Sequence, residues 1–188
     1  METETVFTLI FLMYNYFMKK TILFICNGNI HRSVIAEKYL SGVLRQKGLD
    51  KKFTVTSYGL QGTKGTAKPL HKNLKEYSKE YKAALPMLRE LKIDVTDHLF
   101  QKITPTVIKK ATVIIAMDKK IYLNSKNSLL KQFPQAKNKI HTFSEITKNH
   151  QDIKDPAGSG SAKVHGTVIK NICFTIKKNL ETILEWTK

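Results

Sequence analysis

Near its start the chain passes from a buried-strand pattern to a helix pattern through a short polar loop. Residues 20–25 (KTILFI) form an apolar run with β-branched content, which is typical of a strand buried on both faces of a sheet. From about residue 34 to residue 46 apolar side chains recur at helical spacing, and Gly48 follows as a typical helix end. The loop between them reads CNGNIHRS (26–33). This succession predicts a unit of a parallel sheet, with the loop at the carboxyl end of its strand.

Strand and helix patterns alternate along the rest of the chain, which favours a parallel sheet with helices on both faces. Ligands of such sheets bind beyond the carboxyl ends of the strands, where residue 26 is expected to lie. The further strands are expected at residues 52–59, 111–117 and 139–143. The further helices are expected from Pro69 to about Leu91 with a break at Pro86, after Thr104-Pro105, after a capping Asp118, and over 162–186.

Composition limits the function classes. The 188 residues suit one domain, and the net charge of +17 favours anionic partners. Only three of the 32 basic residues are arginines, and the lysines are spread over the whole chain, so a solvated surface is favoured over a nucleic-acid site. The two cysteines, Cys26 and Cys173, form no disulfide framework and no zinc-ligand spacing, which indicates a reducing, cytoplasmic location.

Residues 1–17 do not fit this pattern. Their apolar run is too short for a transmembrane helix, and they lack the basic start and cleavage site of a secretory signal. Because MKKTILFIC from Met18 reads as a natural start, we interpret residues 1–17 as a non-native extension or a misassigned start, and 18–188 as one domain. A weak membrane-surface anchor is the alternative interpretation.

The loop at 26–33 has the composition of an oxyanion cradle. Gly28 and Asn29 tolerate positive φ, so that several main-chain N–H groups can point inward. The following helix directs its first N–H donors at the same place. Arg32 adds a planar, bidentate donor suited to two phosphate oxygens. The loop is therefore predicted to bind a phosphate group.

The same surroundings act on Cys26. A helix start, an arginine and converging N–H groups favour the thiolate, and the Ser33 hydroxyl is placed to hydrogen-bond the sulfur. A thiolate at the floor of a phosphate cradle is a nucleophile directed at phosphorus. The alternative is that Cys26 is a small core residue at the end of a strand. The buried strand before it and the helix after it favour the nucleophile.

These residues resemble the low-molecular-weight protein tyrosine phosphatases. The similarity covers essentially all of residues 18–188 and implies a single-domain, three-layer α/β/α fold with a central four-stranded parallel sheet, of the flavodoxin-like, phosphotyrosine phosphatase I type. The segments that resemble the family are ILFICNGNIHRSVIAE (22–37), SYG (57–59), DVTDH (94–98), ITPTVIKKATVIIAMD (103–118) and DIKDPAGSG (152–160).

The resemblance implies a role for each matching residue. Cys26 would be the nucleophile and Arg32 the clamp on phosphate and transition state. Asp155 would be the general acid, and would then act as base on the hydrolytic water. Ser33 would ease the departure of the thiolate in the second step. The remaining roles are a phosphate cradle from the N–H groups of Asn27, Gly28, Asn29, Ile30, His31 and Arg32, and a brace of the loop by contacts of Asn29 to Ser57 and His98.

The implied activity is metal-free and cofactor-free hydrolysis of a phosphomonoester through a phosphocysteine, most simply by a protein tyrosine phosphatase. The substrate would be a phosphorylated protein or a small phosphate ester, the product inorganic phosphate, and the enzyme a monomer without a specific nucleic-acid partner or a transmembrane segment. A phosphate-dependent binding module with weak or no turnover is the alternative.

Several positions depart from the family pattern. His31 stands where the family often has a second cysteine, so the protective disulfide is lost and the charge of the cradle could change near neutral pH. Ala157 and Gly158 stand where aromatic residues usually wall the substrate ring, and Tyr58 is only a weak substitute. Ile30 resembles the tyrosine-phosphatase type, because the family's arginine phosphatases carry threonine there.

The charged segment 68–85 is longer than its counterpart in the family. We interpret it as a solvated helix extension, because charge runs usually mark an exposed face. A partner-docking element is the alternative.

Overall fold

The computed structural model describes residues 19–147 and 152–188. The expectation for residues 1–17 therefore lies outside the described residues. No helix in the described part of the chain combines the length and the apolar character needed to cross a membrane.

A four-stranded parallel sheet forms the centre of the molecule, as predicted. The strand order is β2-β1-β3-β4, and every neighbouring pair is parallel. The register places Cys26, the last residue of β1, beside Gly59, the last residue of β2. The strands are β1 (Lys20–Cys26), β2 (Phe53–Gly59), β3 (Val113–Ala116) and β4 (Ile140–Thr142).

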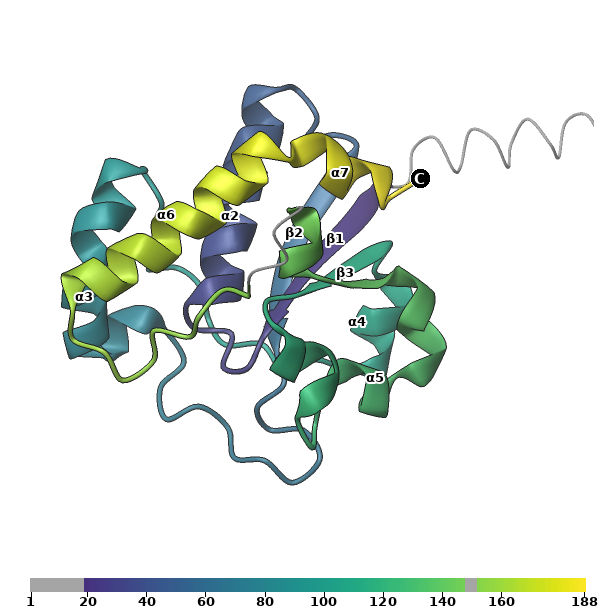
Figure 1. Ribbon diagram of the computed structural model, residues 1–188, viewed down its shortest axis with the longest axis horizontal. Helices are drawn as coiled ribbons and strands as arrows, with labels where there is room; N and C mark the ends of the chain where they lie inside the picture. Colours follow the sequence, from purple (N-terminus) through teal and green to yellow (C-terminus); the bar gives the residue numbers. More distant parts are fainter. Residues whose placement is uncertain (1–18, 148–151) are drawn as a thin grey trace, which may run out of the picture.

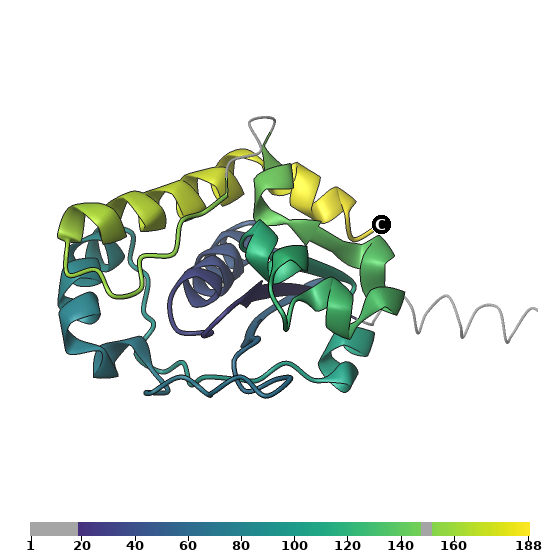
Figure 2. The same ribbon diagram turned by 60° about the horizontal axis from the view of Figure 1, so that its bottom comes forward.

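Helices cover both faces of the sheet, which confirms the three-layer prediction (Figures 1 and 2). Successive side chains of β1 point to opposite faces of the sheet. Phe24 packs in the cluster with α2 and α6, and Leu23 packs in the cluster with α4 and α5. The first face also carries α3, which lies along α6. The helices are α2 (Arg32–Gln46), α3 (Ser78–Glu90), α4 (Pro105–Lys110), α5 (Leu129–Gln132), α6 (Ala162–Lys178) and α7 (Leu180–Glu185).

The expected helix from Pro69 to Leu91 is wrong in its first third. Residues 67–73 form irregular chain and bends, and only a short 3₁₀ turn, η1 (Leu74–Glu76), precedes α3. The helix then continues through Pro86 without a break, because its buried face, with Ala84 and Leu88, packs on α6. This packing overrides the intrinsic tendency of proline to end a helix.

Other boundaries are close to expectation. Thr104 caps α4 by accepting from the Val107 N–H, as predicted. The C-terminal helix is interrupted at Asn179, whose side-chain amide donates to the Thr175 carbonyl at 2.9 Å. The remaining short elements are η2 (Lys120–Asn124), η3 (Pro134–Lys139) and η4 (Phe143–Ile146).

Candidate active site

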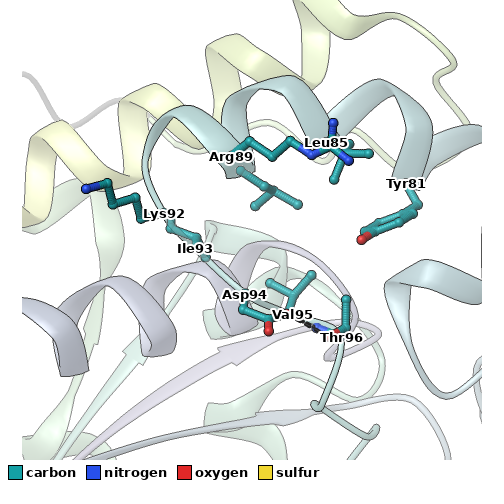
Figure 3. Close-up of a pocket in the computed structure, with 9 residues that line it drawn as sticks. Tyr81, Leu85, Arg89, Lys92, Ile93, Asp94, Val95 and Thr96 are labelled. Atoms are coloured by element: carbon teal, nitrogen blue, oxygen red, sulfur yellow. Dashed lines mark hydrogen bonds between the residues drawn. The ribbon is translucent and has the colours of Figure 1, made fainter.

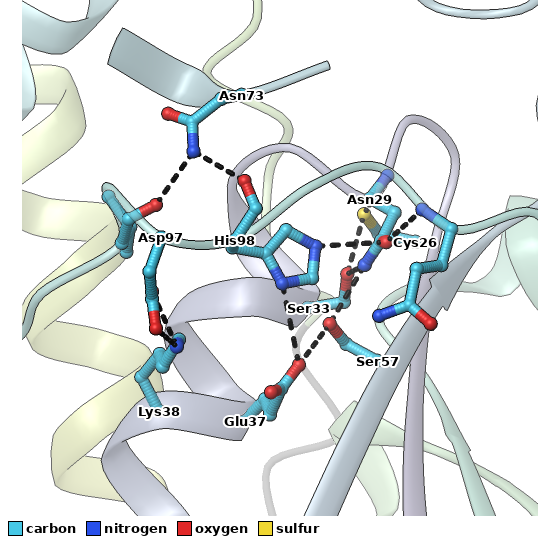
Figure 4. Close-up of polar contacts among 11 residues, drawn as sticks. Cys26, Asn29, Ser33, Glu37, Lys38, Ser57, Asn73, Asp97 and His98 are labelled. Carbon is cyan, nitrogen blue, oxygen red and sulfur yellow. Dashed lines mark hydrogen bonds and ion pairs between the residues drawn. The ribbon is translucent and has the colours of Figure 1, made fainter.

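Cys26 ends β1 and its thiol lies at the floor of the loop that leads into α2. The Ser33 Oγ is 3.0 Å from Cys26 Sγ, and the main-chain N–H of Asn29 donates to the same sulfur at 3.1 Å. The sulfur is almost fully buried, with Cys26 3% exposed. The Ser33 hydroxyl and the Asn29 N–H therefore converge on the sulfur (Figure 4).

Asn29 braces this loop from within. It has a positive φ of 49°, and it uses all four of its side-chain hydrogen-bonding sites. Its Nδ2 donates to Ser57 Oγ at 2.8 Å and to Ser33 Oγ at 3.2 Å. Its Oδ1 accepts from the His98 Nε2 at 3.0 Å and from the Gln101 N–H at 2.9 Å. Because Ser33 accepts from Asn29, its own proton is free to point at the sulfur.

Glu37 extends this network and was missed by the sequence analysis. It lies one turn after Ser33 in α2, and it accepts from the Ser57 hydroxyl at 2.5 Å. Its carboxylate is also 3.9 Å from the His98 ring (Figure 4). Burial raises the pKa of Glu37, although the Ser57 hydrogen bond acts in the opposite direction. The sequence did contain a signal for this position: Glu37 follows Ser33 by four residues, and residues at this spacing lie on the same face of a helix.

Gly59 lets the loop pack against the end of β2. A Cβ at this position would lie 2.9 Å from the Asn27 carbonyl oxygen and 3.0 Å from Asn29 Cβ. The Gln61 N–H donates to the same Asn27 carbonyl at 2.9 Å. The phosphate loop and the segment after β2 are therefore in close main-chain contact.

Arg32 begins α2, and its guanidinium reaches three acceptors. Nη1 donates to Asp118 at 2.5 Å and to the Ile153 carbonyl at 3.0 Å, and Nη2 donates to Asp155 at 2.5 Å. Burial works against the charge, but the negative groups around it, above all Cys26 and Asp155, raise the pKa of Arg32. The arginine thus links the nucleophile to the segment that carries Asp155.

Asp118 has two roles, of which the sequence analysis found one. Its Oδ1 accepts from the Ile121 N–H at 2.8 Å, which is the predicted helix cap, and its Oδ2 holds Arg32. The second role follows from topology, because β3 is the neighbour of β1 and both strands end at the same edge of the sheet.

Asp155 approaches from the other side on an open loop. Its side chain is 45% exposed, and its Oδ1 accepts from the Ala157 N–H at 3.3 Å. The loop is held to α3 by the Gly158 N–H, which donates to Glu80 Oε1 at 2.8 Å.

His31 corrects one expectation. Its Nε2 is 3.0 Å from the His165 Nδ1, and the His165 Nε2 is 3.0 Å from the Ser159 carbonyl. A carbonyl only accepts, so His165 donates through Nε2, and in the neutral form of His165 the Nδ1 accepts from the His31 Nε2–H. Burial, assisted by His165 and Arg32, lowers the pKa of His31 to about 3. His31 is therefore neutral near pH 7, and the predicted change in cradle charge is wrong.

A cavity of about 150 Å³ joins these groups. Its floor and sides come from the phosphate loop, with Cys26 and Arg32, and from Asp155 and Ala157. Tyr77 and Glu80, at the start of α3, complete it, and the sequence analysis assigned neither to the site. Tyr58 instead packs against the opposite hydrophobic cluster. The segment 68–85 is therefore more than a solvated extension, because its middle forms one wall of the cavity.

The structure brings the predicted site residues into one region. Ser33 and Asn29 contact the Cys26 sulfur, and the other cradle residues and Asp155 line the same cavity as Cys26. Cys173 lies apart, buried in α6, and burial raises the pKa of its thiol to about 12. Within residues 19–147 and 152–188, no three His, Cys, Asp or Glu side chains are grouped as metal ligands.

Comparison with known proteins agrees with this geometry. A family model described as low molecular weight phosphotyrosine protein phosphatase matches residues 21–187. A low molecular weight protein-tyrosine-phosphatase of Acinetobacter johnsonii is 31% identical over 137 residues, which are 73% of this chain and 80% of the relative. A protein-arginine-phosphatase of Bacillus subtilis is 27% identical over 146 residues, 77% of this chain and 83% of the relative.

A solved structure is also similar. The low molecular weight protein tyrosine phosphatase of T. tengcongensis superposes with a TM-score of 0.68 at 25% identity, covering 87% of this chain and 99% of that one. The matched family model spans nearly the whole chain and includes the loop that holds Cys26. The chain belongs to the low molecular weight phosphotyrosine protein phosphatases, a family of hydrolases that act on phosphoric monoesters.

Proposed function

We propose that this chain is a protein tyrosine phosphatase in which Cys26 is the nucleophile, Arg32 the phosphate clamp and Asp155 the general acid. The observation that carries the proposal is the convergence of Ser33 and the Asn29 N–H on the Cys26 sulfur, in the cavity that also holds Arg32 and Asp155. A thiolate, a cationic clamp and a carboxyl group in one cavity are the set that phosphomonoester cleavage requires.

In the first step the Cys26 thiolate attacks phosphorus and the bond to the ester oxygen breaks. Asp155 gives its proton to that oxygen, so that the alcohol leaves neutral and Cys26 carries the phosphoryl group. Main-chain N–H groups of the loop and Arg32 stabilise the charge on the equatorial oxygens. For this step Arg32 Nη2 exchanges its contact with Asp155 for a phosphate oxygen, while Nη1 stays on Asp118.

In the second step water attacks the phosphocysteine. Asp155, now a carboxylate, accepts a proton from that water, and the sulfur leaves as a thiolate. The Ser33 hydroxyl, which is oriented by Asn29, donates to the departing sulfur and lowers the barrier. Inorganic phosphate is released, and Asp155 is protonated again for the next cycle.

A phosphorylated tyrosine is the preferred substrate in this proposal. Ile30 lines the cavity, and an apolar side chain there suits an aromatic ring better than a guanidinium. The similarity to a protein-arginine-phosphatase makes phosphoarginine the second candidate. A reducing, cytoplasmic location remains part of the proposal, because both cysteines are free thiols.

A turnover screen tests the proposal. Purified protein is offered a phosphotyrosine peptide, the matching phosphoserine and phosphoarginine peptides, and an aryl phosphate, all with a chelator present. We expect the highest kcat/KM on phosphotyrosine, and a loss of about 10⁴-fold or more in Cys26→Ser. Cys173→Ala is the matched control and retains turnover. Unchanged turnover in Cys26→Ser would overturn the mechanism, and binding of phosphotyrosine without turnover in the wild type would favour a binding module.

A further inference from the structure

The cavity lacks an aromatic residue on its acid loop, but it has one on another wall, Tyr77. The acid loop offers only Ala157 and Gly158 after its Asp155-Pro156 pair, so it presents no ring to a substrate. Among the described residues that line the cavity, Tyr77 is the one Phe, Tyr or Trp side chain. It comes from a different part of the chain, the junction between η1 and α3.

His71 holds the Tyr77 side chain through its main chain and its ring. Its hydroxyl accepts from the His71 N–H at 3.1 Å, and its ring meets the His71 ring edge to face, with 4.9 Å between centroids. The ring is half-buried and packs against the main hydrophobic cluster. An aromatic side chain fixed in this way loses little conformational entropy when a ligand packs on it.

The segment that carries Tyr77 is itself anchored. The buried Asn73 amide donates to the carbonyls of Val95, Thr96 and His98, and its Oδ1 caps η1 by accepting from the Lys75 N–H at 2.8 Å. Figure 4 shows Asn73 beside His98, whose ring in turn holds Asn29 of the phosphate loop. The position of Tyr77 relative to the cradle is therefore fixed through buried hydrogen bonds.

We propose that Tyr77 is the specificity-determining wall of this phosphatase: the substrate's aromatic ring packs on it, in place of an aromatic residue after Asp155. The inference rests on the proposed function, which supplies the phosphate site that Tyr77 borders. Ring-on-ring contact at such a wall selects phosphotyrosine over phosphoserine without any change in the chemistry at Cys26. The binding gain from one ring pair corresponds to roughly three- to tenfold in affinity.

The chain provides a matched control one helical turn away. Tyr81 is also half-buried in α3, but it lines a different cavity, between α3 and residues 93–96 (Figure 3). A general effect of removing a tyrosine at this end of α3 would be seen at both positions. An effect on the active site is expected only at Tyr77.

The test compares two non-hydrolysable ligands that differ by one ring, phenylphosphonate and methylphosphonate. Binding of each is measured by calorimetry in the wild type, Tyr77→Ala, Tyr77→Phe and Tyr81→Ala. We expect Tyr77→Ala to weaken phenylphosphonate roughly three- to tenfold and to leave methylphosphonate unchanged. Tyr77→Phe, which keeps the ring, and Tyr81→Ala retain the wild-type preference.

Two results would contradict the proposal that Tyr77 selects the substrate. One is an unchanged phenylphosphonate affinity in Tyr77→Ala, and the other is an equal weakening of both ligands, which would mean that Tyr77 only positions the cradle. Because calorimetry needs no turnover, failure of the proposed function is seen separately, as a wild type that hydrolyses no phosphate ester. If Tyr77→Ala does not fold, Tyr77→Leu replaces it, since leucine fills the space without a ring.

Discussion

The two sides of the active site are built differently. On the side of the phosphate loop, Asn29 and Ser33 are fully buried and Arg32 is 2% exposed. Side-chain hydrogen bonds tie Asn29 to Ser33, β2 and the 98–101 segment, and tie Arg32 to Asp118. On the side of the acid loop, Asp155 is 45% exposed, and the loop is held by Arg32, by Lys119, and by Glu80 and His165.

In the proposed mechanism the braced side holds the nucleophile and the phosphate donors, and the open side supplies the general acid and the wall that selects the substrate. Bond cleavage needs donors fixed within a fraction of an ångström, and the braced side provides them. Substrate selection needs only a shaped wall, which can come from whichever segment lies nearby. In this chain that segment is the start of α3, which lies beside the acid loop and α6 (Figure 2).

Of the variants that leave the nucleophile in place, the largest effect is expected on the open side, at the proposed general acid. Asp155→Ala should slow hydrolysis roughly 10²- to 10³-fold for esters with poor leaving groups and much less for good ones, because only a poor leaving group needs the proton. Rates over a series of aryl phosphates measure this dependence.

Asp152→Ala is the control for the acid loop. Asp152 is exposed nearby and accepts from the Lys119 N–H at 3.4 Å, so its removal should leave the leaving-group dependence as it is in the wild type. An equal loss for all leaving groups in Asp155→Ala would show that Asp155 positions Arg32 and does not donate a proton.

A smaller effect is expected from disturbing the braced side. Gly59→Ala places a Cβ against the Asn27 carbonyl and Asn29, so the phosphate loop must shift. We expect kcat to fall by roughly tenfold, because a small displacement of a pre-organised site strongly reduces the rate. Stopped-flow or steady-state kinetics with an aryl phosphate measures it.

Gly42→Ala, in the interior of α2, is the matched control. A Cβ there meets nothing within 4 Å, so the variant should gain about 1 kcal/mol of stability and keep its kcat. If Gly59→Ala also kept its kcat, the loop would be more tolerant than its packing indicates.

The last effect is a change of stability in acid, and it leaves the rate at neutral pH out of the comparison. The folded protein keeps His31 neutral, with a pKa of about 3, while the unfolded chain takes up a proton near pH 6.5. The stabilisation is complete above pH 6.5 and is lost as the pH falls towards 3, by at most about 1.4 kcal/mol per pH unit. Denaturant unfolding at a series of pH values should give His31→Asn a shallower slope than the wild type. Parallel slopes would contradict the buried, neutral histidine.

Local patterns were enough to predict much of the fold. The β1–loop–α2 succession, the Thr104 cap and the four strands each have a strong signal within a short window of sequence. The roles of Cys26, Arg32 and Asp155 remain proposals. The strand-end rule indicated the place of the loop with Cys26 and Arg32, and the family resemblance indicated that Asp155 joins it.

The features that were missed depend on contacts between distant segments. Nothing near Tyr77 in the sequence indicates that its ring borders the cavity, because its place is set by Asn73 and the 95–98 segment. The neutral state of His31 likewise follows from burial and from His165, which lies 134 residues along the chain.

The central claim is that the phosphoryl group passes through the Cys26 sulfur. The most direct measurement is rapid acid quenching of the enzyme during turnover of a phosphotyrosine peptide labelled in its phosphate, followed by mapping of the labelled peptide. The account predicts label on Cys26 in the wild type. With a labelled aryl phosphate that has a good leaving group, Asp155→Ala should carry more label, because the first step then hardly needs the acid while the second step loses its base. Full turnover with no label on Cys26, or with label on another residue, would contradict it.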